Sequence, residues 1–282
     1  VLLQAPTLLL ENSGDFHRLL LSVDAGTETN NVTLILEGMG DPRDQENFRS
    51  KGYLEIRSFP TREVLAATSD FLFHGMDYEF LKGDGDIQAK VWLQSSEDGS
   101  AYDLSGQLDL QRIEVAAGKT AVQLDDVSTQ VVGRWNFDEN WMLQLQQFQS
   151  KYGENNLREV SIQIDYDKKE SEVNLAFDQI NLQQFHGLLD ASGAIGQGRL
   201  SEILRDLNPR GNLKSLWVNV PLVSPKSWQV RGQLDKVFVD AWRGVPTLTA
   251  LDGYVTADAD SGGILINSGD KFSMHFIPTY DA

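Results

Sequence analysis

The sequence IQAKVWLQ at residues 87–94 alternates Ile, Ala, Val and Leu with Gln, Lys, Trp and Gln. A period of two residues is that of a β-strand, because successive side chains of a strand point to opposite faces. Val91 and Leu93 are therefore expected on one apolar face, with Lys90 and Gln94 on the other. The same alternation recurs in four other stretches, at residues 32–37, 160–166, 173–177 and 272–276. The chain is predicted to be mainly β.

The polar positions of these strands are filled mostly by Gln, Ser, Thr and Asp, which is typical of antiparallel sheet with one face in water. Turn signals separate the strands at residues 12–15, 97–100, 258–263 and 268–270. Short helices are predicted from a Thr61 cap to about Phe71, near 182–189 and near 201–207. The expected fold is an elongated, curved antiparallel sheet built from repeats, which forms an apolar groove and carries a few short helices.

An internal repeat supports this organisation. Gly106-Gln107-Leu108-Asp109 recurs as Gly232-Gln233-Leu234-Asp235, and in both copies the apolar positions change from even to odd further along the strand. Such a phase change indicates a β-bulge or a bend. The repeat predicts two stacked units, residues 1–140 and residues 141–282, in one continuous structure. Chance similarity among turn sequences is the alternative.

The composition excludes several classes of function. The 282 residues include 41 Asp and Glu against 24 Lys and Arg, a net charge of −17, so no nucleic-acid partner is expected. The chain has no cysteine, hence no disulfide and no thiolate metal site. No apolar run is long enough for a membrane helix, and the N-terminus is no signal peptide. We expect an interior section of a longer protein.

The sequence offers no catalytic constellation. The four histidines lack metal-ligand spacing, and Gly83–Asp86 lacks the glutamate of a calcium loop. The glycine-rich residues 193–198 lack the Lys-Ser/Thr ending of a phosphate loop. We therefore expect no enzyme activity, no cofactor and no metal. Six tryptophans would suit stacking on sugars, but packing in the core or at sheet edges is the preferred interpretation for most of them.

Strands with one apolar face must hide that face, either in a sandwich of two sheets or in a curled sheet whose trough holds acyl chains. The residues that would line such a trough are predicted from the alternation alone. The candidate lipid-groove lining is Leu34, Leu36, Val91, Leu93, Leu108, Leu110, Ile162, Ile164, Val173, Leu175, Phe177, Val218, Val220, Met274 and Phe276.

Several segments resemble a known family. Residues 207–213, LNPRGNL, resemble the helix-ending P-x-G-x-L segment of AsmA-like envelope proteins, especially the YhdP group. Residues 228–234, WQVRGQL, are similar to the repeat strand of that group. The stretches at residues 2–10, 242–246, 251–255 and 263–276 resemble its other strands and turns. The resemblance is clearest over residues 200–280.

The resemblance implies a large Gram-negative envelope protein, related to the TamB-like proteins, with an inner-membrane anchor and a long periplasmic β-structure. It implies phospholipid as the partner, carried between the inner and outer membranes in an apolar groove. This chain would then be a periplasmic section, and the membranes would be reached through other parts of the protein. No catalytic residues carry over from the family.

Two other hypotheses stay open. The chain could be a structural or adhesive β-repeat of the envelope with a closed core and no ligand. It could also be an acid-dependent hydrolase of envelope polymers that uses turn carboxylates such as Asp125, Asp126 or Asp138. A hydrolase needs two carboxyl groups about 5 to 10 Å apart across one cleft.

Overall fold

The computed structural model describes residues 4–24, 31–44, 47–65, 81–117, 120–136, 140–153, 155–184, 205–224, 227–269 and 271–276. The chain divides into two compact units. Unit 1 comprises Val1–Val115, Gln123–Glu159 and Asp165–Lys169, and unit 2 comprises Ala116–Val122, Val160–Ile164 and Glu170–Ala282. The predicted boundary between residues 140 and 141 concerns sequence repeats, and it stays a prediction.

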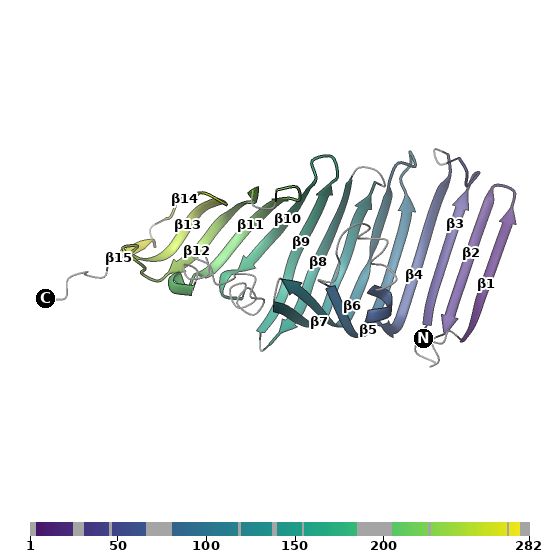
Figure 1. The fold of residues 1–282 in the computed structure, drawn as a ribbon, viewed down its shortest axis with the longest axis horizontal. Helices are drawn as coiled ribbons and strands as arrows, with labels where there is room; N and C mark the ends of the chain where they lie inside the picture. Colours follow the sequence, from purple (N-terminus) through teal and green to yellow (C-terminus); the bar gives the residue numbers. More distant parts are fainter. Residues whose placement is uncertain are drawn as a thin grey trace. The chain divides into compact units, whose positions relative to one another are not determined.

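Unit 1 is an antiparallel sheet whose strands follow one another in chain order (Figure 1). Its strands are β1 (Gln4–Ser13), β2 (Phe16–Asp24), β3 (Asn31–Met39), β4 (Arg49–Pro60), β5 (Leu81–Ser95), β6 (Tyr102–Ala117), β7 (Thr120–Trp135) and β8 (Asn140–Tyr152). The last residues of β6 and the first of β7 belong to unit 2, and the next strand, β9 (Asn155–Asp167), also has residues in both units. The alternating sequence IQAKVWLQ at residues 87–94 thus lies in β5.

Unit 2 repeats the arrangement. Its strands are β10 (Glu172–Asn181), β11 (Arg210–Pro221), β12 (Gln229–Val239), β13 (Thr247–Asp258), β14 (Gly262–Ile266) and β15 (Ser273–His275). Strands β10 to β14 follow in chain order, and β15 pairs with β13 beside β14. Leu234, Val237 and Leu251 form a buried core cluster here, with Leu251 only 2% exposed.

The predicted fold class is confirmed: the described residues form mainly antiparallel sheet, with a few short helices. Residues 61–65, 182–184 and 205–207 are helical, and the remainder of each predicted helix lies outside the described residues. The predicted N-cap at Thr61 is wrong. Its hydroxyl is buried without a hydrogen-bond partner among the described residues, and its methyl group packs against Gly83.

The predicted phase change corresponds to real bulges. In β12 the register with β13 shifts between Leu234 and Val237, and Lys236 takes a φ of 51°. The extra residue lets the even Leu234 and the odd Val237 both join the core cluster. Beside the first copy the extra residue belongs to β5, where the register with β6 shifts between Asp84 and Ile87.

Candidate apolar binding surface

One row of side chains crosses eight neighbouring strands of unit 1 on a single face. Residues directly opposite one another in an antiparallel pair share a face, so the registers of successive pairs trace the row. This leucine row comprises Leu10, Leu19, Leu36, Gly52, Leu93, Leu104, Gly133 and Leu143, from β1 to β8. The step from β6 to β7 is a direct contact, because a Cβ on Gly133 would lie 3.7 Å from the Cβ of Leu104.

Two further rows lie on the same face. The second row comprises Leu8, Leu21, Leu34, Leu54, Val91 and Gly106. The third row comprises Val23, Val32, Ile56, Ala89 and Leu108. We call the three rows together the apolar face of unit 1. Alternation within each strand places its apolar side chains on this face. The strand register then aligns the apolar side chains of neighbouring strands in continuous rows.

Burial changes across the apolar face. In the third row Ile56 and Ala89 are each 6% exposed, so this side of the face is covered. In the leucine row Leu10 is 69% exposed and Leu36 is 38% exposed. Removing apolar surface from water is favourable, and these exposed leucines remain in water. The leucine row is therefore a surface on which an apolar ligand could bind.

A polar rim follows the leucine row on the same face. It consists of Asn12, His17, Ser50, Ser95 and Tyr102, at the strand ends beyond the leucines. His17 Nδ1 lies 2.7 Å from Asn12 Oδ1, and the Ser50 hydroxyl lies 2.8 Å from the Tyr102 hydroxyl. The backbone N–H of Ser50 donates to Ser95 Oγ at 3.0 Å. All five rim side chains are polar, and the rim contains no Asp, Glu, Lys or Arg.

The opposite face of unit 1 carries ion pairs. Glu37 lies 3.0 Å from Lys51 Nζ and 3.6 Å from Arg18 Nε, and it belongs to the strand that carries Leu36. The hydrogen bond from Lys51 holds the pKa of Glu37 below its ordinary value. Glu55 lies 3.5 Å from Arg57 and 3.9 Å from Lys90. Charged rows of this kind keep one face of the sheet in water.

Unit 2 has an apolar face built in the same way. One row comprises Leu175, Val218, Val230, Ala257 and Gly262, from β10 to β14. A shorter row joins Val173 to Val220, and another joins Gly232 to Val255 and Ile264. Ile264 is 58% exposed at the β14 edge. The core cluster covers the part of this face near Leu251.

The structure brings most of the nominated groove residues together within each unit. Those on the apolar face of unit 1 are Leu34, Leu36, Val91, Leu93 and Leu108, and Leu110 lies beyond them opposite the buried Ile87. Those sharing a face of unit 2 are Val173, Leu175, Phe177, Val218 and Val220. Met274 lies opposite Leu248, while Phe276 is 68% exposed after β15. Ile162 and Ile164 share one side of β9 and are half-buried. Their role as a lining stays a prediction.

Several residues of these rows were not among the lining residues predicted from the sequence. Leu104 and Leu143 continue alternating patterns, in LSGQL and LQL, so a signal for them existed. Gly52 and Gly133 gave no hydrophobic signal, and only the strand register places them in the leucine row. At these two positions the row has no side chain of its own.

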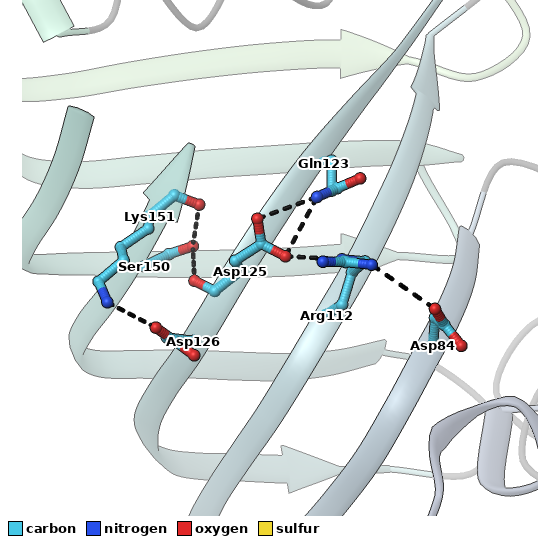
Figure 2. A network of polar contacts seen from close by, with 7 residues as sticks. All are labelled: Asp84, Arg112, Gln123, Asp125, Asp126, Ser150 and Lys151. Atoms are coloured by element: carbon cyan, nitrogen blue, oxygen red, sulfur yellow. Dashed lines mark hydrogen bonds and ion pairs between the residues drawn. The ribbon is translucent and has the colours of Figure 1, made fainter. Parts of the chain in front are cut away.

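The carboxylates considered for hydrolysis are held in ion pairs at a β7 bulge (Figure 2). Asp125 accepts from Arg112 Nε at 2.7 Å, and Asp126 lies 2.6 Å from Lys151 Nζ. The hydrogen bond from Arg112 keeps the pKa of Asp125 below its ordinary value. Asp138 lies outside the described residues. Among the residues that the structure describes, no group of acidic or histidine side chains could hold a metal ion.

Fold and surface together define an antiparallel β-sheet protein in which each unit carries an apolar face, opposed in unit 1 by an ion-paired face. A family model of the YhdP proteins matches residues 2–279. The chain therefore belongs to the YhdP family. Comparisons with curated proteins and with solved structures gave no match. In the described part of the chain, no helix has the length and apolar character needed to cross a bilayer.

Proposed function

We propose that the protein carries phospholipid between the inner and outer membranes of a Gram-negative envelope, with the acyl chains held against its apolar face. It would act in the periplasm and without catalysis. The observation that carries the proposal is the leucine row, which crosses eight strands and includes exposed members such as Leu10 and Leu36. Membership of the YhdP family, a family of envelope proteins, supports it.

The energetics favour a continuous row. Removing one methylene from water contributes about 0.8 kcal/mol, so two acyl chains with roughly 30 methylenes carry on the order of 25 kcal/mol. A lipid can move through an aqueous space only if this stabilisation is nearly constant along its path. Rows that run across the strands give adjacent positions of similar character. The polar rim beside Leu10 and Leu36 would then face the glycerol and phosphate groups.

Native mass spectrometry with lipid extraction tests the proposal. The protein is purified gently from Gram-negative cells, and the masses of the protein and of any retained lipid are measured. We expect bound phospholipid in the unaltered protein. The double variant Leu10→Asp/Leu36→Asp should lose it, because a carboxylate on the leucine row would be desolvated by an acyl chain.

The double variant Leu9→Asp/Met39→Asp is the matched control. Leu9 and Met39 are 49% and 55% exposed, lie in the same strands as Leu10 and Leu36, and point to the opposite face of the sheet. This control should retain lipid and should have the same far-ultraviolet circular dichroism. Equal lipid content in both double variants, or a lipid-free unaltered protein that takes up no fluorescent phospholipid, would contradict the proposal.

A structural β-repeat with a closed core is the second candidate. It is favoured by the core cluster of unit 2, in which Leu234, Val237 and Leu251 are all buried. A lipid-free protein in the experiment above would support this candidate. The two proposals differ most on the leucine row, which a closed core would leave without a role.

A further inference from the structure

The ion-paired face of unit 1 contains a hollow of about 640 Å³. Its floor and walls come from neighbouring strands: Tyr53 from β4, Trp92 and Gln94 from β5, Ser105 from β6, and Arg134 from β7. The volume falls within the roughly 300–1,000 Å³ that is usual for sites of small molecules. Gly52, Leu93, Leu104 and Gly133 of the leucine row also border the hollow. The side chains of Trp92 and Arg134 nevertheless lie on the opposite face from that row, because each is adjacent in sequence to one of its members.

A short side chain creates the hollow. Trp92 lies directly opposite Tyr53 on one side and Ser105 on the other. The rings of Tyr53 and Trp92 are 5.3 Å apart and tilted by 43°. Ser105 carries no bulk to cover the far side of the indole. Trp92 is therefore 49% exposed although it lies well inside a sheet, with strands on both sides.

Polar groups run along one side of the indole. The row next to Trp92 contains Lys51, Gln94 and Asp103, which face one another across β4, β5 and β6. Arg134 of β7 extends the row, with Nη1 3.8 Å from a carboxylate oxygen of Asp103. That distance is longer than a hydrogen bond, so both groups can still bond to a ligand. The row offers donors and acceptors beside an aromatic wall.

A saccharide matches this combination. A sugar ring has an apolar face of C–H groups, which stacks on an aromatic ring, and a periphery of hydroxyls, which exchanges hydrogen bonds with amide, carboxylate and guanidinium groups. An acyl chain would instead desolvate Arg134 and Asp103 without pairing them. Nucleic acid is disfavoured by a net charge of −17.

We propose that this hollow is a saccharide-binding site, with Trp92 as the stacking platform and Gln94, Asp103 and Arg134 as hydrogen-bonding partners of the sugar hydroxyls. The site goes beyond lipid carriage and does not depend on it. A sheet that carries lipid on one face and holds a glycan with the other would be tethered to an envelope polysaccharide while its apolar face stays free.

Isothermal titration calorimetry of the full chain tests the site. The probes are oligomers of N-acetylglucosamine and oligomers of a hexuronic acid, which represent neutral and acidic glycans. We expect one of the two classes to bind, and Trp92→Ala to weaken binding by about tenfold or more, as for a central aromatic contact. Asp103→Ala should weaken the same interaction to a smaller extent.

Two further variants test whether binding occurs in the hollow. Ser105→Phe fills the hollow from an exposed strand position where an aromatic residue is well tolerated, so it should abolish binding in a folded protein. Trp217→Ala is the control, because Trp217 lies in unit 2, with the Arg231 guanidinium 4.0 Å from its ring centre. The Trp217→Ala protein should bind the glycan with unchanged affinity. No heat of binding at about 1 mM of either glycan class would overturn the proposal, and so would unchanged affinity in Trp92→Ala and Ser105→Phe.

Discussion

Leu36 and Gly52 lie opposite each other in the β3–β4 pair, and Cδ2 of Leu36 is 2.9 Å from the position that a Cβ on residue 52 would take. The leucine fills the space that the glycine leaves. A methyl group at residue 52 would be too close only to this mobile end of a side chain, because the next atoms, Leu93 Cβ and Ile35 O, lie at 3.6 and 3.7 Å. At Gly106 a Cβ would meet the carbonyl oxygen of Lys90 and would lie 3.1 Å from the Cα of Val91, which are fixed backbone atoms.

Two alanine substitutions should therefore differ in cost. We expect Gly106→Ala to lower the free energy of unfolding by about 1–3 kcal/mol, because the backbone of β5 must move. Gly52→Ala should change it by less than about 1 kcal/mol, since Leu36 can adopt another rotamer. Urea denaturation followed by tryptophan fluorescence measures both. Equal destabilisation by the two substitutions would contradict this distinction between a backbone and a side-chain neighbour.

Acid should weaken the β6–β7 pairing through Asp125. Its pKa is lower in the folded protein than in the unfolded chain, chiefly because Arg112 donates a hydrogen bond to it. This stabilisation is complete above about pH 4, the ordinary range of Asp, and is lost as the pH falls through the lowered value. Asp125→Asn should remove less than about 1 kcal/mol at neutral pH. The thermal midpoint of Asp125→Asn should depend less on pH below pH 4 than that of the unaltered protein.

Arg112→Ala checks the cause. It removes the donor but keeps the carboxyl group, so its acid dependence should also be shallower than that of the unaltered protein. An acid profile that is identical in all three proteins would show that the Arg112–Asp125 contact contributes nothing to stability.

Ala250 occupies a strained position in β13. Its φ of 52° lies in the left-handed region, which costs a residue with a Cβ roughly 1–2 kcal/mol. Ala250→Gly should raise the free energy of unfolding by about 0.5–1 kcal/mol. Ala257→Gly, in the same strand at a residue without a positive φ, should lower it by a similar amount. Thermal denaturation of the pair would reveal opposite shifts, and shifts of the same sign would refute the assignment of strain.

Leu251 reports on the core of unit 2. It is 2% exposed and lies opposite Val237, so Leu251→Ala should cost about 2–5 kcal/mol. Tyr254→Ala, at a position 51% exposed on the same strand, should cost well under half of that amount. Chemical denaturation distinguishes the two, and a mild effect at Leu251 would mean that the cluster is loosely packed.

Local patterns predicted much of the sheet. Alternation placed Val91 and Leu93 on one face, and the structure aligns them with Leu34 and Leu36. The phase change after Leu234 correctly predicted a bulge. These successes share a cause: each depends on residues a few positions apart, where the period of a strand is directly visible.

The remaining features depend on strand register, which alternation does not encode. Gly52 joins the leucine row only because β4 is aligned so that it meets Leu36 and Leu93. Trp92 was assigned with the other tryptophans to packing, whereas it is half-exposed because Ser105 happens to lie opposite it. Two residues 13 positions apart in the sequence thus define the hollow, and neither has an unusual local pattern.

The pairing of strands in chain order bears on how the protein comes to be folded. From β1 to β6 each described pair joins a strand to the one that follows it, so most backbone contacts close short loops. Low sequence separation favours rapid formation, and each hairpin can add to the sheet as soon as it emerges during synthesis. A growing sheet of this kind always presents its newest strand as the template for the next one.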